Sequence, residues 1–125
     1  MIIMKVILTT SDNNDLNAKV DKQFGRAPFF ALLETDNLKI SFLDNSAADA
    51  SSGAGVMAAQ QVVDKEPAAV IAGNFGPKAF SVLKAAGIKM YSYSGDTVRD
   101  AVKLYQDASL KELLDPTNGA HAGLK

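Results

Sequence analysis

The residues with the most suggestive chemistry lie in a glycine-rich turn near the middle of the chain. A short apolar run, Val70–Ala72, leads directly into Gly73-Asn-Phe-Gly-Pro77. Pro77 stands where a helix would begin, because proline is favoured in the first helical turn. The first N–H groups of a helix have no partner inside it, so such a turn can bind an anion through backbone amides alone. The candidate binding residues here are Asn74, Phe75 and Gly76.

Three other polar segments supply hydroxyl groups and amides of the same kind. One runs from residue 9 to residue 26 and ends at a cation, Arg26, within Phe24-Gly-Arg-Ala-Pro28. The second, Ser51-Ser-Gly-Ala-Gly55, precedes a predicted helix, and the third is Ser92-Tyr-Ser-Gly-Asp-Thr97. An arginine beside unpaired amides is typical of an anion clamp. The candidates in these segments are Arg26, Ser52, Gly53, Ser94 and Thr97.

Each candidate also has a purely structural interpretation. Serine, threonine and aspartate at these places are typical helix caps, which applies to Ser51, Ser52, Asp96 and Thr97. Gly73 and Gly76 are also what a tight turn requires, and Arg26 can be an ordinary surface arginine.

The apolar pattern predicts the elements that carry these loops. Alternating and continuous apolar runs indicate strands, and apolar residues at helical spacing indicate helices. Asp36-Asn37 predicts a two-residue hairpin turn, which makes the strand after it half-buried and places it at a sheet edge. Gly87 is placed to end the second helix in a left-handed conformation. The predicted strands are 4–9, 29–35, 38–42, 70–72 and 88–91, and the predicted helices are 51–64, 77–86 and 96–106.

This element order predicts an α/β fold in three layers, α/β/α, with a ribonuclease-H-like outline. Strand–helix–strand units require parallel crossovers, and the hairpin requires an antiparallel pair. A mixed five-stranded sheet of order 3-2-1-4-5, with strand 2 antiparallel, satisfies both. Ligands of such sheets bind beyond the carboxyl ends of the parallel strands, where the four polar segments would meet.

Length and composition limit the remaining possibilities. The 125 residues predict a single domain over 1–115, followed by a flexible tail over 116–125. The net charge of −1 gives nucleic-acid binding no electrostatic drive. The absence of cysteine excludes disulfides, thiolate metal ligands and a thiol nucleophile. Neither a signal sequence nor an apolar run of about 20 residues is present, so we expect a cytoplasmic protein without a membrane segment.

Catalytic interpretations find little support. His121 is the single histidine and lies in the glycine- and alanine-rich tail, where a solvated residue is the simplest expectation. A nuclease with the predicted outline would need clustered carboxylates for two metal ions, and the predicted first and fourth strands lack them. Gly53-Ala-Gly55 is too short for a phosphate-binding P-loop. The sequence therefore favours a non-enzymatic binding protein without a metal-ligand motif.

Several segments in order carry a resemblance to a known family. They are Gln23-Phe-Gly-Arg-Ala-Pro-Phe-Phe30, Gly53-Ala-Gly55, Val70-Ile-Ala-Gly-Asn-Phe-Gly-Pro-Lys-Ala79, Ala86-Gly-Ile-Lys89 and Gly95-Asp-Thr-Val-Arg99. In this combination the chain resembles the dinitrogenase iron–molybdenum cofactor biosynthesis family of nitrogenase accessory factors, over about residues 4–110. The resemblance implies a ribonuclease-H-like fold and a role in nitrogen fixation. It also implies a non-catalytic carrier of an iron–sulfur or iron–molybdenum-type cluster, with cofactor-biosynthesis proteins as partners.

Two departures from the family pattern bear on how such a cargo would be held. Family members commonly have histidine before Phe-Gly-Arg, where this chain has Gln23, and many have histidine- or cysteine-rich tails, where this chain has only His121. Gln23 can hydrogen-bond to a sulfide or an organic acid on the cofactor, which makes it a further candidate binding residue. The alternative is a regulatory or protein-interaction module of the same fold that binds no metal.

Overall fold

The structure is a computed structural model that describes residues 4–50 and 52–116. Each strand is a short apolar segment and each helix has one apolar side, as the sequence pattern requires. The strands are β1 (Lys5–Thr10), β2 (Phe29–Glu34), β3 (Lys39–Asp44), β4 (Ala69–Ala72) and β5 (Lys89–Ser92). The helices are α1 (Ala54–Lys65), α2 (Pro77–Ala85), α3 (Val98–Gln106) and a 3-10 turn, η1 (Asp15–Asn17).

The five strands form one mixed sheet of order β3-β2-β1-β4-β5, as predicted. β2 is antiparallel to both of its neighbours, with Val6 opposite Leu33 and Leu33 opposite Ile40. β1, β4 and β5 run parallel. Their carboxyl ends therefore lie at one end of the sheet, and β3 is an edge strand.

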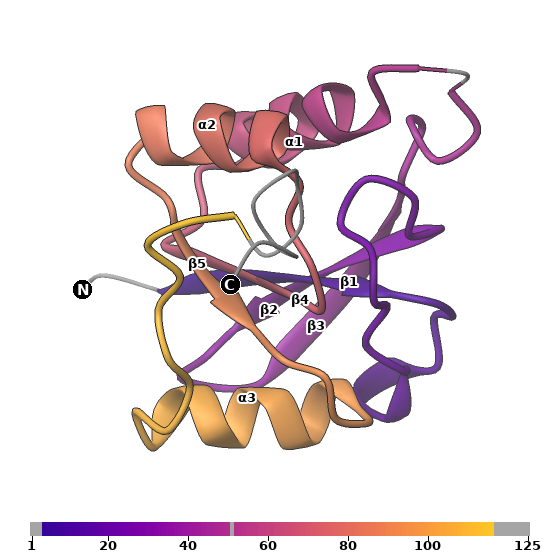
Figure 1. Cartoon of the computed structure of the whole chain (residues 1–125). Coiled ribbons are helices and arrows are strands. Elements are labelled where there is room, and N and C mark those ends of the chain that lie inside the picture. The colour runs from indigo at the N-terminus through magenta and orange to yellow at the C-terminus, as the bar shows by residue number, and fades with distance from the viewer. Residues whose placement is uncertain (1–3, 51, 117–125) are drawn as a thin grey trace.

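Helices cover both faces of the sheet, which confirms the three-layer architecture (Figure 1). α1 and α2 lie over one face, and their buried residues pack with Ile7 and Val70. α3 lies over the other face, where its buried residues pack with Val6, Leu8 and Ile71. The alternation of Val6, Ile7 and Leu8 between the two clusters follows from the two-residue period of a strand.

The hairpin between β2 and β3 differs from the predicted two-residue turn. Four residues, 35–38, connect the strands, and the positive φ of 59° falls on Leu38 rather than on Asp36 or Asn37. The backbone N–H of Leu38 donates to the carbonyl of Glu34 at 2.8 Å. Asn37 acts through its side chain, whose Oδ1 accepts from the N–H of Lys39 at 2.9 Å. The preference of Asp36 and Asn37 for positive φ therefore did not determine the conformation of the β2–β3 turn.

Helix ends show smaller differences from expectation. α1 begins at Ala54, after Gly53 with a φ of 74°, so residues 52 and 53 precede the helix that was predicted to include them. Its buried residues, Ala54, Ala58, Ala59 and Val62, are all small. Gly87 follows α2 with a φ of 78°, which confirms the predicted left-handed ending.

The segment after α3 covers the β5 edge of the sheet. Glu112 forms an antiparallel bridge with Tyr91, and the N–H of Leu113 donates to the carbonyl of Met90 at 2.8 Å. Leu113 packs against the α1–α2 side of the core, whereas Leu114 is 69% exposed. His121 lies outside the described residues. Within residues 4–50 and 52–116, no helix is long and apolar enough to cross a lipid bilayer.

Candidate functional site

The loops after β1 and β4 lie side by side at the carboxyl end of the parallel strands. Gln23 and Asn74 form a parallel bridge, and the N–H of Phe24 donates to the carbonyl of Asn74 at 3.1 Å. The N–H of Gly73 donates to the carbonyl of Asp21 at 3.2 Å. A Cβ at Gly73 would lie 2.7 Å from the Cα and carbonyl oxygen of Lys22, so only glycine permits this close approach.

Two adjoining hollows open beside this contact. The first has a volume of about 230 Å³ and the second about 330 Å³. They share Gly25, Ala54, Gly55 and Gly76. We call them together the glycine cradle, which is lined by residues 23–26, 53–56, 74 and 76–79.

Two helices begin at the cradle without a side-chain cap. Gly53 is the N-cap of α1 and Gly76 the N-cap of α2, and neither can offer a side-chain oxygen to the first amides. Pro77 follows as the first residue of α2. The uncapped first turns carry partial positive charge from the helix dipoles. The cradle is therefore suited to an anion, with backbone amides as donors.

Arg26 lies at the rim of the cradle and is exposed. One of its terminal nitrogens donates to the carbonyls of Ala48 and Ala50, the first at 3.2 Å. The guanidinium has five N–H donors, so this anchoring leaves donors for a ligand. Lys78 lines the second hollow and adds a second cation.

Asn45 fixes the backbone that carries Arg26. Its side chain is only 5% exposed. Its Nδ2 donates to the carbonyl of Ala27 at 2.8 Å and to that of Gly25 at 3.1 Å. Its Oδ1 accepts from Gln61 Nε2 of α1 at 3.0 Å. The arginine segment is therefore attached to α1 through a buried amide.

Phe75 belongs to the hydrophobic core and not to the lining of the cradle. Its side chain is fully buried and stacks on Phe24 with ring centroids 5.3 Å apart. Phe24 in turn contacts Phe30 of β2 at 5.9 Å between centroids. The predicted binding residue Phe75 thus contributes packing, while its neighbours Asn74 and Gly76 line the cradle.

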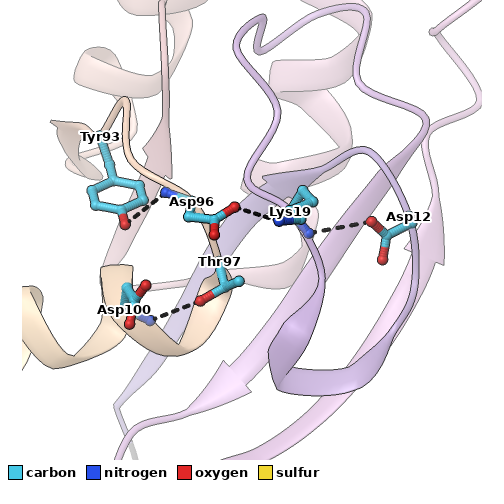
Figure 2. A network of polar contacts seen from close by, with 6 residues as sticks. All are labelled: Asp12, Lys19, Tyr93, Asp96, Thr97 and Asp100. Atoms are coloured by element: carbon cyan, nitrogen blue, oxygen red, sulfur yellow. Dashed lines mark hydrogen bonds and ion pairs between the residues drawn. The ribbon is translucent and has the colours of Figure 1, made fainter.

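A different network lies where α3 begins (Figure 2). Thr97 caps α3, because its hydroxyl accepts from the N–H of Asp100 at 3.3 Å. Lys19 Nζ lies 2.6 Å from Asp96 Oδ1, and this ion pair raises the pKa of Lys19, chiefly through the hydrogen bond. The N–H of Asp96 donates to the hydroxyl of Tyr93 at 2.9 Å. The polar groups at the start of α3 are therefore largely paired within the protein.

The predicted site residues divide between these places. Gln23, Arg26, Gly53, Asn74 and Gly76 lie together in the cradle. Ser94 and Thr97 lie outside its lining, in the loop before α3, and Ser52 is exposed just before Gly53. Ser51 lies outside the described residues.

Sequence reasoning missed several residues of the cradle. Gly25 and Gly55 approach so closely that a Cβ on Gly25 would lie 2.9 Å from the Cα of Gly55. Lys78 had a usable signal, since it is the cation next to the proline that begins α2. Asn45 had none, because its partners lie 16 to 20 residues away in sequence.

The donor set of the cradle fits an anion and does not fit a metal ion held by side chains. The sequence has no cysteine. Within residues 4–50 and 52–116, no group of three or more histidine, aspartate or glutamate side chains could hold a metal ion. The described residues that line the cradle therefore offer amides and cations, and no cysteine, histidine or carboxylate side chain is among them.

Comparison with known proteins identifies the family of the chain. Residues 4–108 match the family model described as dinitrogenase iron–molybdenum cofactor. The protein MJ0580 of Methanocaldococcus jannaschii is 31% identical over 113 residues, which is 88% of this chain and 92% of that protein. The apo form of the orange protein from Desulfovibrio gigas has a TM-score of 0.88 and 32% identity, covering 94% of this chain and 98% of its own. The NifB-like protein TM1290 from Thermotoga has a TM-score of 0.78 and 32% identity, covering 94% of this chain and 99% of its own. The chain thus belongs to the dinitrogenase iron–molybdenum cofactor family.

Proposed function

We propose that this protein is a non-catalytic carrier that binds an anionic iron–sulfur or iron–molybdenum-type cofactor, or its precursor, in the glycine cradle. Backbone amides at the starts of α1 and α2 would hydrogen-bond to the outer sulfides or to an organic acid of the cargo. Arg26 and Lys78 would supply positive charge, and Gln23 and Asn74 would supply side-chain amides. Cofactor-biosynthesis proteins would be the source and the recipient of the cargo.

The observation that carries this proposal is the meeting of two uncapped helix starts in one glycine-lined hollow. Gly53 and Gly76 leave the first amides of α1 and α2 without side-chain partners. Family membership supports an iron–sulfur or iron–molybdenum-type cofactor as the anion, and a cradle lined by amides and cations supports binding through the outer atoms of the cargo. A cargo held by its outer atoms can be released intact, which suits a carrier.

The test is an anaerobic binding experiment. The apo-protein is mixed with isolated iron–molybdenum cofactor, passed over a sizing column, and iron is assayed in the protein peak. We expect stoichiometric iron with the native chain. Arg26→Ala should lower the affinity by at least about tenfold, because a hydrogen bond to a charged group contributes roughly 1.5–3 kcal/mol.

Lys89→Ala is the matched control, because Lys89 is an exposed cation at the amino end of β5, the end of the strand away from the cradle. It should retain full iron binding. A folded protein without iron in its peak would refute the carrier role and favour the interaction module that binds no metal. Equal binding by the native chain and Arg26→Ala would remove Arg26 from the site.

A further inference from the structure

A groove beside α3 forms a second candidate binding surface. α3 lies over the face of the sheet opposite α1 and α2 (Figure 1). Its volume is about 210 Å³. None of its lining residues belongs to the glycine cradle. We call it the α3 groove, and it is lined by Leu16, Leu38, Arg99, Val102, Lys103 and Gln106.

Leu38 stands at one end of the α3 groove in a conformation that leucine rarely adopts. Its φ is 59°, a value normally found for glycine or asparagine, and 40% of the residue is exposed. The turn does not depend on the leucine side chain, because Gln106 Nε2 of α3 holds the turn through the carbonyl of Thr35 at 2.8 Å. A bulky apolar side chain is thus displayed where folding alone would favour glycine.

The remaining walls combine an apolar floor with a cationic rim. Val102 is 2% exposed and forms the floor together with the half-buried Leu16. Arg99 and Lys103 are exposed and lie one helical turn apart on α3. Neither forms an ion pair within the described part of the chain, and no carboxylate lines the α3 groove.

We propose that the α3 groove docks an acidic amphipathic helix of a partner protein. Residues four apart in a helix lie about 6 Å from each other, so carboxylates at positions i and i+4 of a partner helix match the spacing of Arg99 and Lys103. Leucines at i+3 and i+7 of that helix lie on the same face and would pack against the more accessible apolar residues of the groove, Leu38 and Leu16. This surface is independent of the cargo site, and either proposal can fail alone.

The test uses the full chain labelled with ¹⁵N and three 16-residue helical peptides. The first carries glutamates at i and i+4 and leucines at i+3 and i+7, the second replaces the glutamates by lysine, and the third replaces the leucines by glutamine. We expect only the first to shift the amide signals of Leu38, Lys103 and Gln106. Equal binding of the first two peptides, or no shift at these amides with the first, would overturn the proposal.

Variants separate docking from folding. Leu38→Gly should retain or raise the melting temperature and weaken the first peptide at least tenfold. Lys103→Ala should weaken it and reduce the salt dependence of binding, while Lys39→Ala, a neighbouring cation on β3, should change neither. A lower melting temperature of Leu38→Gly with unchanged affinity would make Leu38 a folding residue and overturn the proposal. Dodecanoate, a fatty acid, is tested as a small amphiphile beside the peptides. Amide shifts at the α3 groove with dodecanoate but not with the first peptide would also overturn the proposal.

Discussion

The helix starts at the carboxyl end of the sheet are built in two different ways. α1 and α2 begin at Gly53 and Gly76, without side-chain caps, and open into a shared hollow. α3 begins at Thr97, whose hydroxyl caps it, beside an ion pair between Lys19 and Asp96. The first arrangement leaves donors for a ligand, whereas the second uses them within the protein. The same fold element is therefore left without a side-chain cap at one place and is closed by a cap at another.

The two regions also differ in how the β1–β2 loop is attached. On the α3 side, backbone hydrogen bonds join Val20 to Asp96 and Val98 to Ala18, each at 2.9 Å. On the cradle side, the backbone hydrogen bonds from Phe24 to Asn74 and from Gly73 to Asp21 form between backbones that only glycine allows to approach so closely. Substitutions that add one methyl group should therefore have unequal effects in the two regions.

The largest expected effect is that of Gly73→Ala. The added Cβ would lie 2.7 Å from backbone atoms of Lys22, which cannot rotate away. We expect a loss of about 3 kcal/mol in the free energy of unfolding, together with loss of cargo binding, because the Gln23–Asn74 contact would separate. Urea denaturation and the iron assay measure the two effects.

Gly95→Ala is the matching change on the α3 side. Its Cβ would meet the Tyr93 ring and hydroxyl, which can move as a side chain at the cost of the hydrogen bond from Asp96. The expected loss is about 1 kcal/mol, with cargo binding retained. Equal losses in the two variants would contradict the proposed difference between backbone and side-chain contacts.

A second pair of variants divides the cradle itself. The Cβ of Gly25→Ala would lie 2.9 Å from the Cα of Gly55, whereas that of Gly55→Ala would lie 3.5 Å from the Cβ of Ala79, an ordinary contact. We expect Gly25→Ala to cost about 1–2 kcal/mol and to weaken cargo binding. Gly55→Ala should gain about 0.5 kcal/mol, because alanine is the better helix former. Thermal denaturation of both proteins checks the signs, and a loss in both would show that α1 cannot tolerate any side chain there.

Much of the fold could be predicted because its signals are local. Strand alternation, helical spacing and Pro77 gave the elements, and connection rules gave the sheet order. The turn at Leu38 was predicted wrongly because residue preference is weaker than the hydrogen bonds that position the turn. The strand-like contact of Leu113 with Met90 has no local signal and was missed.

The candidate site was predictable as a set of loops but not as a shape. Glycine, proline and one arginine marked the loops that form the cradle. Which of these loops line the cradle depends on contacts between residues distant in sequence, such as Gln23 with Asn74 and Asn45 with Gly25. The sequence allowed two interpretations of Thr97, a helix cap and a ligand-binding residue. In the structure its hydroxyl caps α3. Its proposed part in ligand binding stays a prediction.

Thr97→Ala tests whether Thr97 only caps α3 or also binds the ligand, and its expected effect on stability is intermediate in size. Loss of the cap should cost about 1 kcal/mol in the free energy of unfolding. Cargo binding should not change, because Thr97 does not line the cradle. Thr97→Ser, which keeps a capping hydroxyl, should restore most of the stability. Weaker iron binding by Thr97→Ala at a temperature where it is fully folded would extend the site to the start of α3.

The smallest expected effect concerns the ion pair between Lys19 and Asp96. The hydrogen bond and the charge of Asp96 raise the pKa of Lys19 above its ordinary value in the folded chain. Between the lower pKa of Lys19 in the unfolded chain and its higher pKa in the folded chain, the folded chain keeps the Lys19 proton longer. The free energy of unfolding therefore falls as the pH rises through this range. Burial, and then the charge of Tyr91, raises the pKa of Tyr105 and adds a loss of the same sign above pH 10. Tyr105→Phe removes that second contribution and is the background for the measurement.

In the Tyr105→Phe background, Asp96→Asn should reduce the alkaline fall in stability, measured by urea denaturation between pH 8 and pH 11. High salt should reduce it too, because the paired side chains are 58% and 60% exposed and salt screens exposed charges. A fall that depends on neither Asp96 nor salt would mean that backbone pairing and the Thr97 cap alone secure the start of α3. The contrast with the glycine cradle would then rest on capping and not on charge.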